Sequence, residues 1–164
     1  MKLSIIIITF NEEKMIEDCL KSVKGLGQEI LVIDSGSSDK TVEIAQEMGV
    51  KVFVNKFKDF ASQRNFALQK ATGEWILYVD ADERMTSELK EEILKHLPAD
   101  ATHQALQAGV QNDPSASSGP SAFSLRRKNF YFGNHEWPKI EKLERLFKKE
   151  KLKGWFGKVH ESPK

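Results

Sequence analysis

The fold class is decided by residues 3–13, which read LSIIIITFNEE. The first part of this stretch is an almost unbroken run of β-branched apolar side chains, which is typical of a strand buried on both faces of a sheet. Polar and acidic side chains follow at once. In open parallel sheets, ligands bind beyond the carboxyl ends of the strands, so residues 9–13 are the first candidates for a binding site.

Strands and helices alternate along the next eighty residues. Apolar residues recur at helical spacing after the first strand, and three further short apolar runs have the length and composition of strands. The expected elements are a helix over 12–24, a strand over 29–34, a helix over 38–48, a strand over 50–54, a helix over 60–71, a strand over 75–79 and a helix from Thr86 or Ser87 to Leu97. This order predicts an α/β fold, with a mostly parallel sheet and helices on both faces.

The rest of the chain divides into two further segments. Residues 99–121 hold almost nothing to bury and are expected to form a flexible loop or linker after an α/β half over 1–98. Residues 122–164 are expected to form a small C-terminal β region, with short strands over 122–127, 143–147 and 152–156. Its aromatic residues, Trp137, Trp155 and Phe132 among them, either stack on sugar faces or fill the core of that region. With 164 residues, we expect one domain overall.

The two ends of the chain differ in charge. Residues 1–125 carry 13 Lys and Arg against 19 Asp and Glu, a net charge of −6 (13 − 19), whereas residues 126–164 carry 12 against 5, a net of +7 (12 − 5). The acidic part suits cation binding and makes a nucleic-acid partner unexpected. The basic part suits attraction to anions, although residues 148–153 would equally suit a solvated hairpin surface.

The composition and the N-terminus indicate a cytoplasmic protein. No apolar run approaches the roughly 20 residues that a membrane-spanning helix needs. The N-terminus lacks the charged, apolar and small-residue zones of a signal peptide. The single cysteine, Cys19, fits a reducing compartment. Peripheral association with the inner face of the membrane, through the basic tail, is left open.

Two aspartates at the end of the fourth strand are the centre of the functional hypothesis. Asp80 and Asp82 are two positions apart and can converge on one hard cation, Mn²⁺ or Mg²⁺, which prefers oxygen ligands and shares them with substrate phosphates. The cation would neutralise a departing diphosphate. An isolated Asp-x-Asp is more often a turn with a capping aspartate. The polar residues at the three other strand ends favour the metal site here.

Asp34 and Arg64 follow the second and third strands. The Asp34 carboxylate can accept a base N–H or ribose hydroxyls, and the Arg64 guanidinium can bind a phosphate or a base carbonyl. The alternatives are turn hydrogen bonds for Asp34 and a solvated helix position for Arg64. For Asp39 we expect only turn and cap hydrogen bonds.

Four motifs in this order carry a resemblance to a known family. They are IIITFNEE (residues 6–13), VIDSGSSDKT (32–41), QRNFAL (63–68) and YVDADER (78–84). Together they resemble family 2 glycosyltransferases, which have the GT-A fold, over about residues 1–97. The tail resembles a bacterial branch of that family related to lipopolysaccharide-core glycosyltransferases, through FYFG (130–133), WP (137–138), RLF (145–147) and GKVHE (157–161).

The resemblance implies a role for each of ten residues. Thr9, Asn11, Glu12, Asp34, Arg64 and Asp80 would hold the nucleotide of a nucleotide-diphosphate sugar, with a UDP-sugar expected first. Arg145 would hold the diphosphate. Asp80 and Asp82 would ligate Mn²⁺ or Mg²⁺, with His160 as a further ligand. The family's reaction inverts the anomeric centre and needs a general base, for which Glu161 is the candidate. Alternatively, His160 is an ordinary half-buried histidine and Arg145 pairs with Glu144 or Glu141.

The function expected on this basis is a metal-dependent, inverting sugar transfer of the hexosyltransferase type. The acceptor would be a saccharide or lipid-linked molecule of lipopolysaccharide-type glycan synthesis. Relatives continue beyond the Val-His-Glu element, so we expect a truncated chain, for which a non-catalytic nucleotide- or glycan-binding module is the main alternative. A haloacid-dehalogenase-like phosphatase is a weaker alternative, because Arg84 stands where that motif has Thr or Val and three strands precede it.

Overall fold

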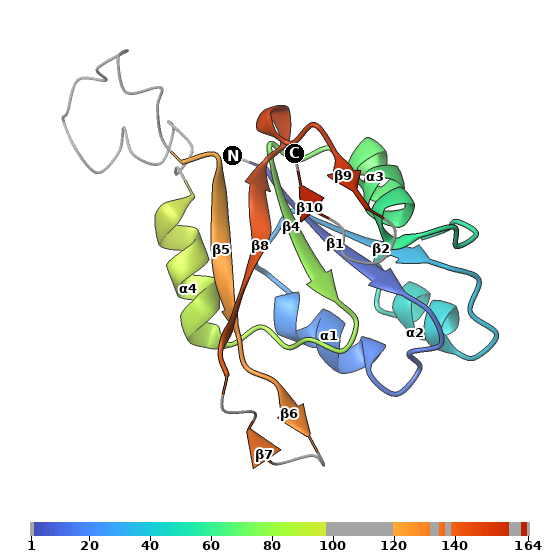
Figure 1. Ribbon diagram of the computed structural model, residues 1–164. Coiled ribbons are helices and arrows are strands. Elements are labelled where there is room, and N and C mark those ends of the chain that lie inside the picture. Colours follow the sequence, from blue (N-terminus) through green and yellow to red (C-terminus); the bar gives the residue numbers. More distant parts are fainter. Residues whose placement is uncertain (1, 98–119, 132–134, 137–138, 158–161, 164) are drawn as a thin grey trace.

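The molecule is built on one six-stranded sheet with the strand order β3-β2-β1-β4-β8-β5 (Figure 1). The computed structural model describes residues 2–97, 120–131, 135–136, 139–157 and 162–163. The four strands nearest the β3 edge run parallel, whereas β8 runs antiparallel to β4 and to β5. The bounds of the six strands are Leu3–Thr9 (β1), Glu29–Asp34 (β2), Lys51–Val54 (β3), Trp75–Asp80 (β4), Ala122–Arg127 (β5) and Glu141–Lys148 (β8).

Four helices connect or follow the parallel strands. They are α1 (Ile16–Val23), α2 (Thr41–Glu47), α3 (Phe60–Lys70) and α4 (Ser87–His96). The predicted cap of the last helix is confirmed, because the Thr86 hydroxyl accepts a hydrogen bond from the Leu89 amide. Asp59 caps α3 in the same way, through the Ser62 amide. Each element predicted over residues 1–97 is present with ends shifted by a few residues, which confirms the α/β reading.

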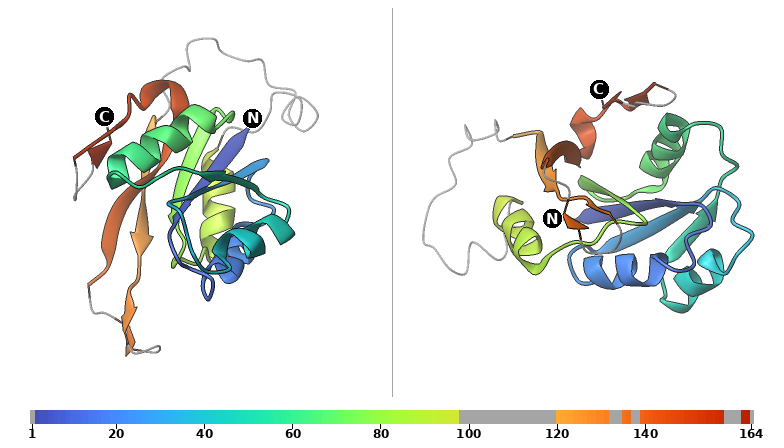
Figure 2. Two further views of the ribbon diagram at one scale, coloured as in Figure 1. Left: turned by 90° about the vertical axis from the view of Figure 1, so that its right-hand side faces the viewer. Right: turned by 60° about the horizontal axis from the view of Figure 1, so that its bottom comes forward.

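Each face of the sheet has its own apolar core. Ile5 and Ile7 of β1 face a cluster that includes Cys19 of α1, Ala45 of α2 and Ile93 of α4. Ile6 points to the opposite face, where α3 and the segment around Trp155 pack. Figure 2 shows α3 on one side of the sheet and the helices α1 and α2 on the other. Because both faces are covered, β1 is apolar throughout rather than alternating.

Of the strand expected over 152–156, only Trp155–Phe156 forms, and the C-terminal region differs from its prediction in a second respect. Its strands β5 and β8 join the main sheet as an antiparallel hairpin beside β4, instead of forming a separate small sheet. The small β elements that remain are two pairs, β9 (Trp155–Phe156) with β10 (Ser162–Pro163) and β6 (Phe130–Tyr131) with β7 (His135–Glu136). A short 3-10 helix over Lys149–Lys151 occupies part of the basic run after β8.

Some expectations fall on residues outside the described ranges. The proposed linker over 99–121 lies there except for its last two residues, as do Phe132 and Trp137. Trp155 is described, and it belongs to the core, against Tyr78 and Phe147. No helix within the described part of the chain is long and apolar enough to cross a membrane.

Candidate active site

Three polar strand ends lie side by side at the carboxyl edge of the parallel sheet. Thr9 of β1 is paired in register with Asp34 of β2, and Ile8 is paired with Asp80 of β4. The prediction that these chain-distant residues share one edge is therefore confirmed. Because β8 is antiparallel to β4, residues that precede Leu146 lie progressively nearer to Asp80, and this register brings Arg145 to the same edge.

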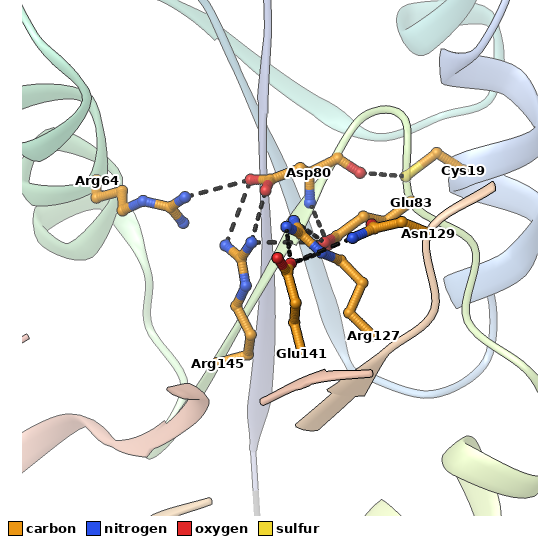
Figure 3. Close-up of polar contacts among 8 residues, drawn as sticks. All are labelled: Cys19, Arg64, Asp80, Glu83, Arg127, Asn129, Glu141 and Arg145. Carbon is orange, nitrogen blue, oxygen red and sulfur yellow. Dashed lines mark hydrogen bonds and ion pairs between the residues drawn. The ribbon is translucent and has the colours of Figure 1, made fainter. Parts of the chain in front are cut away.

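The Asp80 carboxylate is held by two arginines from different elements (Figure 3). Arg145 of β8 binds it through both terminal nitrogens, at 2.6 Å to Oδ2 and 3.4 Å to Oδ1. Arg64 of α3 adds a contact of 3.3 Å to Oδ1. Burial opposes ionisation of this carboxyl, yet Arg145 and Arg64 hold its pKa below its ordinary value. Asp80 is therefore an anion, and the guanidinium fork of Arg145 meets it with both terminal nitrogens.

The network continues from Asp80 to Glu83 and Arg127, which had no predicted role, and to Glu141, which was considered only as a partner of Arg145. Glu83 accepts a hydrogen bond from the Asp80 amide at 2.9 Å, and its other oxygen lies within 3.4 Å of both Arg145 and Arg127. Arg127 of β5 in turn pairs with Glu141 of β8, at 2.5 Å. These alternating charges link α3, β4, β5 and β8 at one place (Figure 3). They also exclude the pairing of Arg145 with Glu144 or Glu141 that was considered from the sequence.

Arg64 is buried against aromatic rings. Its guanidinium carbon lies 4.8 Å from the centre of the Trp155 ring and 5.3 Å from that of Tyr78. The Tyr78 hydroxyl also donates to the Arg64 carbonyl. Only 5% of Arg64 is exposed, so the reading of this residue as a solvated helix charge is wrong. The rings fix the direction in which Arg64 presents its charge to Asp80.

Asp34 makes the turn hydrogen bonds that were the alternative reading. Its carboxylate accepts the amides of Gly36 and Ser37, each at 2.8 Å, and the Ser37 hydroxyl at 2.5 Å. The turn requires a left-handed residue, and Gly36 supplies it with φ +99°. The Asp34 side chain is buried, so its role in nucleotide binding stays a prediction.

The loop after β1 is tied to the turn after β2. The Asn11 side chain accepts the Ser38 amide, and the Asn11 and Glu12 amides donate to the hydroxyls of Ser37 and Thr41. Asn11 itself is left-handed, with φ 55°. Thr9 is buried, and its hydroxyl has no hydrogen-bond partner within the described structure. A buried hydroxyl without a partner is costly, which is consistent with a ligand group arriving at this edge.

Asp39 makes the turn hydrogen bonds expected from the sequence, although the N-cap residue of α2 is Lys40. Its carboxylate accepts the amide and hydroxyl of Thr41 at the start of α2, and it also accepts the Glu13 amide. These bonds hold the two loops together next to Glu12. Asp39 therefore contributes a fixed negative charge to the rim of the site.

The exposed carboxylate of the Asp-x-Asp motif is that of Asp82, since Asp80 is engaged by the arginines. Burial raises the pKa of Glu12, and the neighbouring charges of Asp82 and Asp39 raise it further. A bound cation would reduce the electrostatic repulsion between these carboxylates. No group of three His, Cys, Asp or Glu side chains in the described ranges can hold a metal by itself. The donor set fits Mn²⁺ or Mg²⁺ bound by one or two carboxylates together with substrate phosphates.

Two predicted residues are not placed. His160 and Glu161 lie outside the described residues, so the further metal ligand and the general base stay predictions. The described structure brings together Thr9, Arg64, Asp80 and Arg145, with Asp34 at the end of β2 and with Asn11, Glu12 and Asp82 on the adjoining loops. The roles of Glu83, Arg127 and Glu141 in this network were not predicted, and the sequence holds one signal for them. Glu83 stands three positions after Asp80, a spacing at which a side chain can cap the preceding strand end.

Comparison with known proteins identifies a family over most of the chain and individual relatives over about half of it. The model of glycosyl transferase family 2 matches residues 4–160. An uncharacterised glycosyltransferase of Rickettsia bellii is 45% identical over 92 residues, which cover 56% of this chain and 31% of that protein. The glycosyltransferase SunS of Bacillus phage SPbeta is 44% identical over 92 residues, covering 54% of this chain and 22% of the relative. The chain thus spans less than a third of the length of these two relatives.

Solved structures show partial similarity. Glucosyl-3-phosphoglycerate synthase from Mycobacterium tuberculosis, in complex with Mn²⁺, uridine diphosphate and glucosyl-3-phosphoglycerate, has a TM-score of 0.45 and 26% identity, covering 49% of this chain and 33% of that one. TarS of S. aureus has a TM-score of 0.47 and 30% identity, covering 58% and 20%.

Proposed function

The chain belongs to glycosyl transferase family 2, and we propose that it transfers a sugar from a nucleotide-diphosphate sugar with the help of Mn²⁺ or Mg²⁺. The observation that carries the proposal is the carboxyl edge of the parallel sheet, where Asp80 is held between Arg64 and Arg145. A diphosphate needs cationic side chains, and a divalent cation needs carboxylates. This edge supplies both within one network.

The two arginines are the proposed diphosphate ligands. In the structure they bind the Asp80 carboxylate, which occupies the position of an anion between them. The Nε of Arg145 is buried without a hydrogen-bond partner among the described residues, so this guanidinium retains a donor for a further acceptor. Planar guanidinium groups bind phosphate oxygens in pairs, and the rings of Trp155 and Tyr78 hold Arg64 in place for this.

The nucleoside would lie across the neighbouring strand ends. The buried hydroxyl of Thr9 offers a donor and acceptor at the end of β1. Asn11 and Glu12, on a loop fixed to the β2–α2 turn, provide polar groups at the rim. We propose the base and ribose here, with Asp34 supporting the turn that shapes this part of the site. UDP is the nucleotide to test first.

Asp82 and Asp80 are the proposed metal ligands, with Glu12 close by. When bound, the cation would neutralise the negative charge that develops on the departing diphosphate. The chain's own contribution is to hold the donor, through the arginines and the loop after β1, so that one face of the sugar is open to an acceptor hydroxyl. Glu161 is the proposed base that takes the proton from that hydroxyl, and the displacement then inverts the anomeric centre.

For the acceptor we propose a saccharide or lipid-linked molecule of lipopolysaccharide-type glycan synthesis, handled at the cytoplasmic side of the membrane. The tail motifs and the net charge of +7 over residues 126–164 support this choice, because cations attract phosphorylated lipids. The phosphatase alternative is disfavoured by the match of residues 4–160 to the model of glycosyl transferase family 2.

The test is release of nucleoside diphosphate from a panel of nucleotide-diphosphate sugars, with Mn²⁺, with Mg²⁺ and with a chelator. We expect release from one nucleotide series, dependent on the cation and lost in Arg145→Met. Glu91→Gln, an exposed substitution on α4, is the matched control and should not change the rate. Release that persists in the chelator, or absence of release from the whole panel with every acceptor offered, contradicts the proposal for this chain.

A further inference from the structure

A group of exposed apolar side chains lies beside the candidate site, at the β3 edge of the sheet. Val54 at the end of β3 is 65% exposed, Phe57 in the following loop 45%, and Phe60 at the start of α3 44%. The Phe57 and Phe60 rings contact each other edge to face, with centroids 5.2 Å apart. We call these three residues, with the intervening Lys56 and Lys58, the β3–α3 patch.

The charges of the patch are of one sign. Residues 51–58 contain three lysines and no acidic residue, although residues 1–125 carry a net charge of −6. Lys56 and Lys58 are both exposed. The adjacent acid, Asp59, turns its carboxylate back to the Ser62 amide as the cap of α3. Exposed aromatic side chains therefore alternate with cations, in a part of the chain that is otherwise acidic.

The patch is fixed relative to the candidate site. The Asn55 amide donates to the Asp34 carbonyl, and the Asn55 side chain is bonded to Gln63, which is fully buried. Gln63 also donates to the Ser35 hydroxyl in the turn after β2. The loop that carries Phe57 is thus anchored to the strand and turn of Asp34. Whatever binds the patch is held next to the proposed nucleotide position.

We propose that the β3–α3 patch docks the protein onto a membrane surface that contains anionic lipids. Phenylalanine side chains enter the boundary between headgroups and acyl chains, and lysines beside them bind lipid phosphates. Aromatic side chains also occur in the cores of protein interfaces, but those cores are depleted in Lys and enriched in Arg, whereas the cations of the patch are all lysines, which favours the membrane. The inference goes beyond the transfer reaction and concerns a surface different from the basic tail.

The experiment is co-sedimentation of the full chain with phosphatidylcholine vesicles, with and without about one-third phosphatidylglycerol. No nucleotide or acceptor is needed, so the result is independent of the proposed activity. We expect binding to the anionic vesicles that weakens with salt. The double variant Phe57→Ser, Phe60→Ser should lower the partition coefficient at least about tenfold. Lys56→Gln, Lys58→Gln should lower it only on the anionic vesicles.

The matched control lies on α4, at the other edge of the molecule (Figure 1). Leu94→Ser, Lys95→Gln removes one exposed apolar side chain and one exposed lysine there and should bind like the wild type. The exposed lysine variants test the proposal even where the aromatic variants fail to fold. Three results would overturn the proposal. The wild type binds neither kind of vesicle, or only the tail variant Lys151→Gln, Lys153→Gln loses binding. The third is a dimer in light scattering that the aromatic variants dissociate.

Discussion

Glu29 lies at the amino edge of the parallel sheet, where the strands begin, and Asp80 lies at its carboxyl edge, where they end. Each is a carboxylate held by partners from other elements. Glu29, at the start of β2, accepts the Ser4 hydroxyl at 2.6 Å and both the amide and the hydroxyl of Thr72, and it pairs with Lys51. Although burial opposes its ionisation, these bonds lower its pKa to about 2. This network joins β1, β2, β3 and the turn before β4. We call it closed, because its buried polar groups all have partners.

The network around Asp80 is not closed. Its charges are paired, but the Thr9 hydroxyl and the Nε of Arg145 are buried beside it without partners in the described structure. Buried polar groups are normally satisfied, as they are around Glu29. From this contrast we infer that the network around Glu29 contributes chiefly to stability, and we propose that the carboxyl edge binds a ligand. Substitutions at the two edges should therefore separate stability from activity.

The largest effect is expected from Asp82→Asn at the carboxyl edge. Asp82 is exposed and makes no hydrogen bond or ion pair with the described residues, so the unfolding temperature should not fall. Sugar transfer should fall at least about 100-fold, because an electrostatic partner of the transition state is removed. Steady-state kinetics and thermal unfolding measure the two quantities. Unchanged turnover in Asp82→Asn would place the metal elsewhere.

The converse substitution at the amino edge is Glu29→Gln. It removes a charged acceptor from buried donors, and we expect it to lower the free energy of unfolding by about 2 kcal/mol. Donor affinity and turnover of the folded enzyme should match the wild type. Urea unfolding monitored by circular dichroism tests the first expectation, and kinetics below the unfolding temperature test the second. A loss of donor affinity in Glu29→Gln would break the division between the edges.

Within the carboxyl edge, Arg145→Lys should weaken binding of the nucleoside diphosphate about tenfold. Lysine keeps the charge but cannot bind with two nitrogens as Arg145 does. Arg127→Lys is the matched control, because Arg127 belongs to the same network but contacts Glu83 and Glu141 instead of Asp80. Titration calorimetry compares the two variants. Equal losses would mean that the network acts as a whole and Arg145 has no special role.

The smallest effects are expected in the pH dependence of stability, with opposite signs at the two edges. The pKa of Glu29 is lowered, so its stabilisation is present above its ordinary value of 4.5 and is lost as the pH falls towards 2. The pKa of Glu12 is raised by burial and by Asp82 and Asp39, so its ionisation destabilises the fold at neutral pH. Below pH 4.5, Glu29→Gln should flatten the acid loss of stability.

Glu12→Gln supplies the second half of the pH comparison. It should be slightly more stable than the wild type at pH 7, and this difference should shrink as the pH falls through the raised pKa of Glu12. Urea midpoints measured from pH 3 to neutral pH for the three proteins distinguish the slopes. Parallel curves for wild type and Glu12→Gln would show that the pKa of Glu12 is not raised in the folded protein.

The sequence was sufficient for the parallel half of the fold because its signals are local. The apolar runs of β1, β2 and β4 and the cap at Thr86 are read within a few residues. Parallel connections then force Thr9, Asp34 and Asp80 to one edge. The placement of β8 between β4 and β5 had no local signal, since it depends on pairing across residues far apart in the chain.

The same distinction explains the candidate site. The motif residues at strand ends could be predicted, but not which partners they choose. Arg145 could pair with a neighbour or with Asp80, and only the register of β8 against β4 decides this. The alternative reading of Arg64 as a solvated charge stayed open because one of its two aromatic contacts, Trp155, lies ninety-one positions later in the chain. Contacts of this kind come from tertiary packing, which a local pattern does not encode.

The central claim, that the carboxyl edge binds a nucleoside diphosphate through a cation held by Asp82, is tested most directly by titration calorimetry. UDP, and then GDP, dTDP and CDP, are titrated with and without Mn²⁺ into wild type, Asp82→Ala and the control Glu91→Gln. We predict binding of one nucleotide that requires the cation, is abolished in Asp82→Ala and is retained in Glu91→Gln. Binding of equal strength in Asp82→Ala and wild type, or no binding of any nucleotide by the wild type, would contradict the claim.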